Sequence, residues 1–288
     1  MSKLEPVIKW SGSKRSQAEK IVSYINKNYE TYYELFCGGC SVLFYILNYF
    51  PSRFKYYVCN DINSDLISVY KEIKFHPDLL YKEYTYHWKK LNSYIDLNRK
   101  KEYFNIIRSE FNKTRSPYLF FFIMRTTTNG MPRYNKDGKF NNSFHVTRDG
   151  INPIRLEQII LNWSHLINKY DVQFISESYE LFNPNNDDFL YLDPPYFNTK
   201  GMYYGTIDYS ILFKYLEKIK CDYFMSFDGI AGSENNVVDV PKSLYNYHYL
   251  IDSGNSSFRR VIGKNKHVNV KESLYIKSDN IKIIRTLF

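Results

Sequence analysis

The 288-residue chain is predicted to form an α/β fold around a parallel sheet, interrupted by a basic and mostly helical insert. Three observations predict this fold. A strand, a glycine turn, a helix and a second strand follow one another near the N-terminus, strand-like runs return after residue 170, and the region between them has helical periodicity. We therefore expect one α/β domain, made of residues 1–62 and 170–288, and an insert made of residues 63–169.

The first part of the α/β domain is a βαβ unit. Apolar residues at helical spacing predict a helix from Ala18 to Ile25. The elements that follow are a short strand in "TYYELF" (31–36), a buried helix in "VLFYILNYF" (42–50) and a second strand in "FKYYVCND" (54–61), which ends in an acid. This order of elements implies parallel pairing of the two strands.

The insert is predicted to consist of helices at residues 64–73, 80–91, 101–111 and 153–167, which have helical periodicity, and of a buried helix at residues 116–128. Asp137-Gly138, between the last two, is a hairpin signal with polar flanks. Residues 64–170 contain 18 Lys and Arg against 10 Asp and Glu, so they carry +8 of the net charge of +9. A basic block favours a polyanionic partner, with nucleic acid the first candidate, and a solvated basic surface is the alternative that charge alone leaves open.

The α/β pattern returns near Tyr170. The predicted elements are strands at 171–175, 187–193, 222–228, 244–251 and 267–276, with a helix at 208–220. These runs complete the sheet that the N-terminal unit begins.

Composition excludes several classes of protein. No run approaches the roughly 20 apolar residues of a membrane span, and the N-terminus lacks the apolar core of a signal peptide, so we expect a cytoplasmic protein without membrane partners. The four cysteines are too few and scattered for a disulfide framework, and no Cys/His group at zinc spacing accompanies the close pair Cys37 and Cys40. We interpret the cysteines as buried hydrophobic residues and expect no bound metal.

The stretch "FCGGCS" (36–41) lies where a βαβ unit binds ligands. Glycines after the first strand let a ligand approach the backbone closely, and an acid about 20 residues later, here Asp61, can accept hydrogen bonds from ribose hydroxyls. The stretch lacks the third glycine of the G-x-G-x-x-G fingerprint, which argues against NAD. A nucleoside-containing cofactor is therefore favoured, and a tight turn without a ligand is the alternative.

The stretch "LYLDPPYF" (190–197) carries the strongest signal. An apolar strand delivers Asp193 to the edge of the sheet, and Pro194 and Pro195 then fix the backbone. Neither proline has an N–H, so their carbonyls are expected to face the site as acceptors without competing donors. With Tyr196 as a flat aromatic surface, this motif suits a planar group that bears an amine. The alternative is a rigid turn with a surface tyrosine.

These motifs together resemble the Dam-type, or alpha-group, N6-adenine-specific DNA methyltransferases. The similar segments occur in the family's order and are "KWSGSK" (9–14), "ELFCGGCSVLF" (34–44), "CND" (59–61), "NGMPRYNKDGKFN" (129–141) and "DPPY" (193–196). The resemblance implies a Rossmann-like class I methyltransferase fold, with a mixed seven-stranded sheet and helices on both faces. It also implies that the helical insert is a target-recognition domain containing a β-hairpin.

The resemblance assigns roles to individual residues. The catalytic residues would be Asp193, Pro194, Pro195 and Tyr196. The residues binding S-adenosylmethionine would be Trp10, Lys14, Glu34, Phe36, Gly38, Gly39, Ser41, Asp61 and Asp193, with Glu34 meeting the methionine ammonium and Asp61 the ribose. The DNA-binding residues would be Lys9, Asn129, Met131, Arg133, Asn135 and Lys139. Lys9 is equally well interpreted as a phosphate contact, and Met131, the expected wedge between bases, as a core side chain.

The implied activity is methyl transfer from S-adenosylmethionine to the N6 amine of a flipped-out adenine in a short site of double-stranded DNA, with GATC as the suggested site. The alternatives are a methyltransferase for RNA or for cytosine N4 and a DNA-binding relative without catalysis. An Asp at position 193, instead of Ser or Asn, argues against a methyltransferase for RNA or for cytosine N4. The intact Asp61, Asp193 and Tyr196 argue against a relative that has lost catalysis. The enzyme would act as a monomer or weak dimer on nucleoid DNA, with a cognate restriction endonuclease as a further partner if it belongs to a restriction-modification pair.

Overall fold

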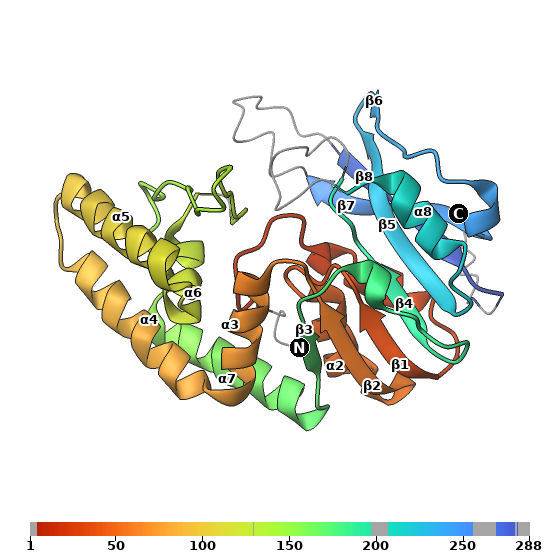
Figure 1. The fold of residues 1–288 in the computed structure, drawn as a ribbon, viewed down its shortest axis with the longest axis horizontal. Coiled ribbons are helices and arrows are strands. Elements are labelled where there is room, and N and C mark those ends of the chain that lie inside the picture. The colour runs from red at the N-terminus through yellow and green to blue at the C-terminus, as the bar shows by residue number, and fades with distance from the viewer. Residues whose placement is uncertain (1–4, 129, 197–206, 256–268, 280, 282–288) are drawn as a thin grey trace.

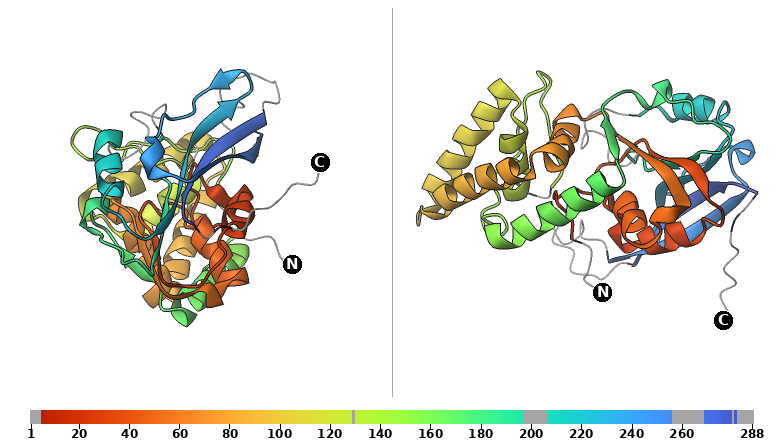
Figure 2. Two further views of the ribbon diagram at one scale, coloured as in Figure 1. Left: turned by 90° about the vertical axis from the view of Figure 1, so that its right-hand side faces the viewer. Right: turned by 90° about the horizontal axis from the view of Figure 1, so that it is seen from below.

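The computed structural model describes residues 5–128, 130–196, 207–255, 269–279 and 281, and Figure 1 shows two lobes side by side. One lobe is built on a sheet, and the other consists of helices. The right-hand view in Figure 2 shows the same side-by-side arrangement, whereas in the left-hand view the sheet lobe faces the viewer with the helices behind it.

The described residues form a sheet of eight strands in the order β3-β2-β1-β4-β5-β8-β7, with β6 paired to β5. The pairs from β3 to β5 are parallel, and β8 runs antiparallel to both β5 and β7. The predicted mixed sheet and the Rossmann-like fold are confirmed, since seven strands form its path and the two-residue β6 adds to it. The strands are β1 (Tyr29–Glu34), β2 (Phe54–Asn60), β3 (Gln173–Ile175), β4 (Phe189–Leu192), β5 (Asp222–Ala231), β6 (Glu234–Asn235), β7 (Tyr247–Asn255) and β8 (Asn269–Lys277).

Both faces of the sheet are buried at its centre, and β4 shows how the sequence achieves this. Phe189 and Tyr191 belong to one apolar cluster, whereas Leu190 and Leu192 belong to another. Successive side chains of a strand point to opposite faces, so an uninterrupted apolar run is what a strand covered on both sides requires. Helices α1 (Ala18–Ser23) and α2 (Ser41–Tyr49) contribute to the first cluster, and α8 (Tyr209–Leu216) contributes to the second.

The helical lobe is formed by the predicted insert. Its helices are α3 (Ser64–Phe75), α4 (Pro77–Asn92), α5 (Leu97–Thr114), α6 (Pro117–Thr126) and α7 (Pro153–Lys169). Helix α3 packs against α6 and α7 and also against β3, and one apolar cluster runs without a break from the sheet into this lobe. The α/β domain and the insert therefore share a core, and the boundaries near residues 62 and 170 stay a prediction.

The segment between α6 and α7 contains little regular structure. Two isolated antiparallel bridges, Thr127 with Phe144 and Tyr134 with Phe140, stand where the sequence predicted a hairpin. Gly138 has a φ of +69° in the turn between the second pair, so the Asp-Gly signal placed the turn correctly. Within the described ranges, no helix is both long and apolar enough to cross a membrane.

Candidate active site

A cavity of about 260 Å³ lies at the carboxyl ends of β1, β2 and β4. This edge is where open α/β sheets bind ligands, because the loops that follow parallel strands gather there. Every residue predicted for the cofactor or for catalysis lines this cavity, and so do Pro132 of the insert and Tyr179. The structure thus brings together segments that are widely separated in the sequence, as the prediction required.

Gly38, the first of the two glycines in the loop after β1, is required for backbone and steric reasons. Gly38 has a φ of +45°, and a Cβ added there would lie 2.8 Å from Nε1 of Trp10. A Cβ on Gly39 would lie 3.4 Å from Cβ of Trp10. The loop therefore packs directly beneath the Trp10 side chain, which a larger residue at position 38 would displace. Next to it, the hydroxyls of Ser13 and Ser41 lie 2.6 Å apart.

The cysteines of this loop belong to the core. All four cysteines are free and buried, and burial raises the pKa of both Cys37 and Cys59. Of the residues that the structure describes, no three His, Cys, Asp or Glu side chains form a group that could hold a metal ion. The loop is shaped by its glycines, while its sulfur atoms fill space.

Asp61 ties the glycine loop to the start of α3. Its Oδ2 accepts a hydrogen bond from the Gly38 N–H at 3.0 Å, and its Oδ1 accepts one from the Asn63 N–H at 2.9 Å. Burial raises the pKa of Asp61 to about 6, although these two bonds act in the opposite direction. The carboxylate is held in place before any ligand arrives, and each oxygen can accept a further hydrogen bond from a hydroxyl group.

Glu34, at the end of β1, is buried. Its Oε2 accepts hydrogen bonds from the Tyr32 hydroxyl at 2.8 Å and from the Leu43 N–H in the first turn of α2 at 3.0 Å. Burial raises its pKa well above the ordinary value. Glu34 therefore both lines the cavity and satisfies a backbone N–H at the start of α2.

A buried ionic cluster surrounds Asp193 at the end of β4. The ammonium of Lys14, which is only 4% exposed, lies 2.8 Å from Oδ1 of Asp193 and 3.1 Å from Oε2 of Glu272 on β8. The Tyr196 hydroxyl contacts the same two carboxylates, at 3.2 Å from Asp193 and 2.9 Å from Glu272. The Lys14 ammonium also lies 4.8 Å from the centre of the Tyr196 ring.

The pKa values of this cluster reflect burial and charge together. Burial raises the pKa of Asp193 to about 6, with Lys14 opposing and Glu272 reinforcing the shift. The pKa of Lys14 is raised, because the two carboxylates outweigh the effect of burial. Burial acts to raise the pKa of Glu272, but the Lys14 charge and the hydrogen bonds from Gln17, Tyr196 and Lys14 together outweigh it, so this pKa is lowered. At neutral pH the cluster therefore holds one cation between two carboxylates.

The two prolines of the motif differ in what their carbonyls contact. The Pro195 carbonyl accepts a hydrogen bond from the Tyr209 hydroxyl at 3.0 Å. The expectation that both carbonyls lack competing donors is thus wrong for Pro195, because α8 begins beside it. The Pro194 carbonyl remains the candidate acceptor for a substrate amine.

Sequence reasoning missed some residues that shape the site. Asn60 connects three segments, since its Nδ2 donates to the carbonyls of Leu35 and Glu177 and its Oδ1 accepts from the Glu177 N–H. Its place directly before Asp61, at the end of β2, was the available signal. Glu272 gave no such signal, because it lies in a strand whose pairing with β5 only the fold reveals.

The residues predicted to bind DNA are placed less uniformly. Arg133, Asn135 and Lys139 are exposed on the loop between α6 and α7, whereas Asn129 lies outside the described residues. Met131 is 3% exposed, so its side chain is in the interior and not at a surface from which it could wedge between bases. The core interpretation of Met131 fits this burial, and the carbonyl of this residue accepts a hydrogen bond from the buried Asn142 side chain at 2.6 Å.

Lys9 lies against the same loop. Its ammonium donates a hydrogen bond to the Thr127 carbonyl at 3.1 Å, and partial burial lowers its pKa, helped by Arg148 and Arg125. The Ser11 N–H bonds the Gly130 carbonyl at 2.9 Å. The N-terminal segment that lines the cavity is therefore joined directly to the insert.

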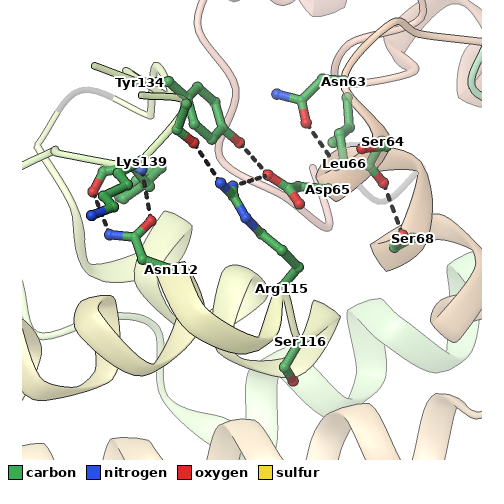
Figure 3. Close-up of polar contacts among 12 residues, drawn as sticks. Asn63, Ser64, Asp65, Leu66, Ser68, Asn112, Arg115, Ser116, Tyr134 and Lys139 are labelled. Atoms are coloured by element: carbon green, nitrogen blue, oxygen red, sulfur yellow. Dashed lines mark hydrogen bonds and ion pairs between the residues drawn. The ribbon is translucent and has the colours of Figure 1, made fainter. Parts of the chain in front are cut away.

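Side chains from α3 and α5 anchor the tip of this loop (Figure 3). Oδ2 of Asp65, in the first turn of α3, accepts from the Tyr134 hydroxyl at 2.7 Å and pairs with Arg115 at 3.2 Å. Arg115, at the end of α5, also donates to the Gly138 carbonyl. Asn112 bonds both backbone groups of Phe140, at 2.7 and 2.9 Å. The loop is thus positioned by its neighbours and not by a strand ladder of its own.

Comparison with known proteins agrees with this geometry. The model of the family described as D12 class N6 adenine-specific DNA methyltransferase matches residues 10–266. The type II methyltransferase M.MjaIII of Methanocaldococcus jannaschii is 32% identical over 208 residues, which cover 67% of this chain and 69% of that protein. M.CviBI of Paramecium bursaria Chlorella virus NC1A is 27% identical over 199 residues, covering 67% and 69%. The DNA adenine methylase of Escherichia coli K12 is 31% identical over 202 residues, covering 68% and 66%.

Proposed function

The chain belongs to the D12 class of N6-adenine-specific DNA methyltransferases, and from this premise we propose that it uses S-adenosylmethionine to methylate adenine within GATC sites of duplex DNA. One observation carries the proposal. Asp193 and Tyr196 line the same cavity as the glycine loop and Asp61, so a group bearing an amine and a nucleoside cofactor would meet in one place.

The lining of the cavity fits S-adenosylmethionine. Three carboxylates, those of Glu34, Asp61 and Asp193, face a space that the glycine loop keeps free of side chains. A cofactor that carries a sulfonium, an ammonium and ribose hydroxyls supplies cations and donors that match these acceptors. Asp61 would hold the ribose and Glu34 the ammonium, while Phe36 and Tyr179, whose ring centres lie 5.2 Å apart, provide apolar surface for the adenine.

Asp193 and the Pro194 carbonyl would act on the substrate amine. The exocyclic nitrogen of adenine is a weak nucleophile because its lone pair is delocalised into the ring. By accepting both amine hydrogens, the two oxygens would favour a tetrahedral nitrogen with a localised lone pair. The bound cofactor supplies an electrophilic methyl group, so the residues of this chain need to contribute alignment and electrostatics. The proton released from nitrogen can leave through water.

Recognition of the DNA site is assigned to the N-terminal segment and the insert loop. An adenine must leave the base stack to reach the cavity, at a cost of a few kcal/mol that stacking on Tyr196 would partly offset. Lys9 and Arg133 would contact base edges, and Asn135 and Lys139 lie on the same exposed turn. The +8 charge of residues 64–170 supports a DNA partner for this lobe. GATC is proposed because Arg133 and Asn129 fit a pattern associated with readers of that sequence.

The test is to express the protein in a methylation-deficient host and to map modified adenines by long-read sequencing. We expect N6-methyladenine at GATC throughout the genome, and far less of it with the Asp193→Ala variant. Methylation at another sequence would overturn GATC but leave the enzyme class intact. Unmodified DNA from a host that contains folded protein would overturn the proposed activity.

A further inference from the structure

We propose that Glu272 is a positioning residue for methyl transfer, which fixes Lys14 and Tyr196 and, through them, orients the carboxylate of Asp193. The inference rests on the proposed function, because it has meaning only if Asp193 accepts hydrogens from the target amine. Glu272 is on β8, beyond the residues 10–266 that the family model matches.

Two contacts of Glu272 converge on one of its oxygen atoms, and the Gln17 side chain also hydrogen-bonds its carboxylate. Oε2 of Glu272 binds both the Lys14 ammonium, at 3.1 Å, and the Tyr196 hydroxyl, at 2.9 Å. These two groups also contact Asp193, and both contact the same oxygen, Oδ1, at 2.8 and 3.2 Å. An Asp193 carboxylate held by Oδ1 presents its other oxygen, Oδ2, as the acceptor for an amine hydrogen.

Glu272 also determines how strongly Asp193 can accept. The Tyr196 hydroxyl has a single hydrogen to donate, and its shorter contact is to Glu272. Oδ1 of Asp193 therefore accepts the weaker hydrogen bond from this hydroxyl. Lys14 alone would neutralise Asp193, but a second carboxylate leaves the group of three with a net negative charge. The other charged or titratable groups near Asp193 are Asp228 on β5, Tyr191 on β4 and Glu34 on β1.

The backbone is shaped to bring Glu272 to this position. The pairing of β5 with β8 shifts register between Phe227 and Ile230. A Cβ on Gly229, inside that irregularity, would lie 2.2 Å from the Lys271 carbonyl oxygen and 3.0 Å from Cα of Glu272. Only glycine allows β8 to pass this close, so the strand pairing itself delivers the carboxylate to Lys14.

The experiment measures single-turnover methylation, at saturating S-adenosylmethionine and DNA, as a function of pH. In the wild type the rate should fall as the pH drops through about 6, because a protonated, neutral Asp193 is a weaker acceptor for the amine hydrogen. In Glu272→Gln the loss of a neighbouring negative charge should move this fall to lower pH, while the rate at neutral pH drops about tenfold. Affinity for S-adenosylmethionine should stay within about twofold. Glu30→Gln, which removes a carboxylate paired with Lys55 on the surface, is the matched control.

If Glu272 had a purely structural role, Glu272→Gln would lower the methylation rate but leave unchanged the pH at which the rate falls. That result would overturn the proposal. A wild-type rate in Glu272→Gln would overturn it too. Glu272→Asp keeps the charge on a shorter side chain, so it should keep the wild-type pH dependence at a reduced rate. If Glu272→Gln does not fold, a full rate in Glu272→Asp would overturn the proposal instead. An Asp193→Ala variant that keeps a tenth or more of the wild-type rate would contradict the proposed function itself. Failure of the proposed function can therefore be told apart from failure of the proposal for Glu272.

Discussion

The cavity at the edge of the sheet and the loop of the insert are held in place in different ways. At the cavity, charged groups are buried and paired, and Lys14 sits between two carboxylates at 4% exposure. On the loop, Arg133, Asn135 and Lys139 are exposed, and the backbone is secured by side chains of α3 and α5. Breaking a buried ion pair commonly costs 3–5 kcal/mol, whereas exposed charges contribute little and are screened by salt. The fold therefore fixes the chemistry of the cavity in advance, while the loop must gain its interactions from DNA.

Asp193→Ala should have the largest effect and tests whether the buried charges of the cavity are positioned in advance for methyl transfer. It removes the acceptor that the cluster orients, so methyl transfer should fall by about 100- to 1,000-fold, the range for losing one preorganised hydrogen-bonding group. DNA affinity should change little, because this carboxylate does not contact phosphates. Single-turnover methylation and a DNA titration measure the two effects. A variant that keeps a tenth of the wild-type rate would contradict the role of Asp193.

Asp61→Ala tests whether the cofactor half of the cavity is equally preformed. Loss of hydrogen bonds to a charged group should weaken S-adenosylmethionine binding by about 1.5–3 kcal/mol, measured by calorimetry. Because Asp61 also holds the Gly38 N–H, thermal unfolding must be measured in parallel. Asp171→Ala, at an aspartate 84% exposed and paired with Lys74, is the control and should bind the cofactor normally. An unchanged affinity in Asp61→Ala would remove this residue from the cofactor site.

Arg133→Ala addresses the loop, where recognition is expected to depend on single exposed residues. An arginine that bonds two acceptors of guanine provides about 1–3 kcal/mol of discrimination, or roughly 5- to 150-fold in preference at one base position. Lys139→Ala is the matched comparison, since loss of a phosphate contact should weaken binding to all sequences alike and flatten its salt dependence. Methylation rates across single-base variants of the mapped site measure both. A uniform loss with Arg133→Ala would make Arg133 a phosphate anchor.

The same contrast explains what the sequence could predict. The glycine loop, Asp61 and the motif at Asp193 were predictable, because each is a short local pattern at the end of a strand. The position of Glu272 was not predictable, because β8 reaches Lys14 by inserting between β5 and β7. In addition, residues 273–276 of β8 are all buried, so the sequence shows no alternation from which to tell which face of the sheet Glu272 lies on. For Met131 the sequence left both the DNA surface and the core open, because the burial of an irregular loop depends on contacts distant in sequence.

Tyr134→Phe should produce the smallest effect and tests whether the anchor of the loop is separate from its reading surface. The variant loses the hydroxyl that donates to Asp65 at 2.7 Å but keeps the ring, and Asp65 keeps its partner Arg115. The net loss should therefore be about 1 kcal/mol, near the value for an ordinary hydrogen bond. Since this contact is one of several that position the loop, DNA affinity should fall by about fivefold at most and for every sequence alike, with S-adenosylmethionine affinity unchanged. Tyr56→Phe, at a tyrosine 59% exposed on β2, is the control and should behave as wild type. A change in preference at one base would instead show that Tyr134 reads DNA directly, and anchor and reader would then be the same residue.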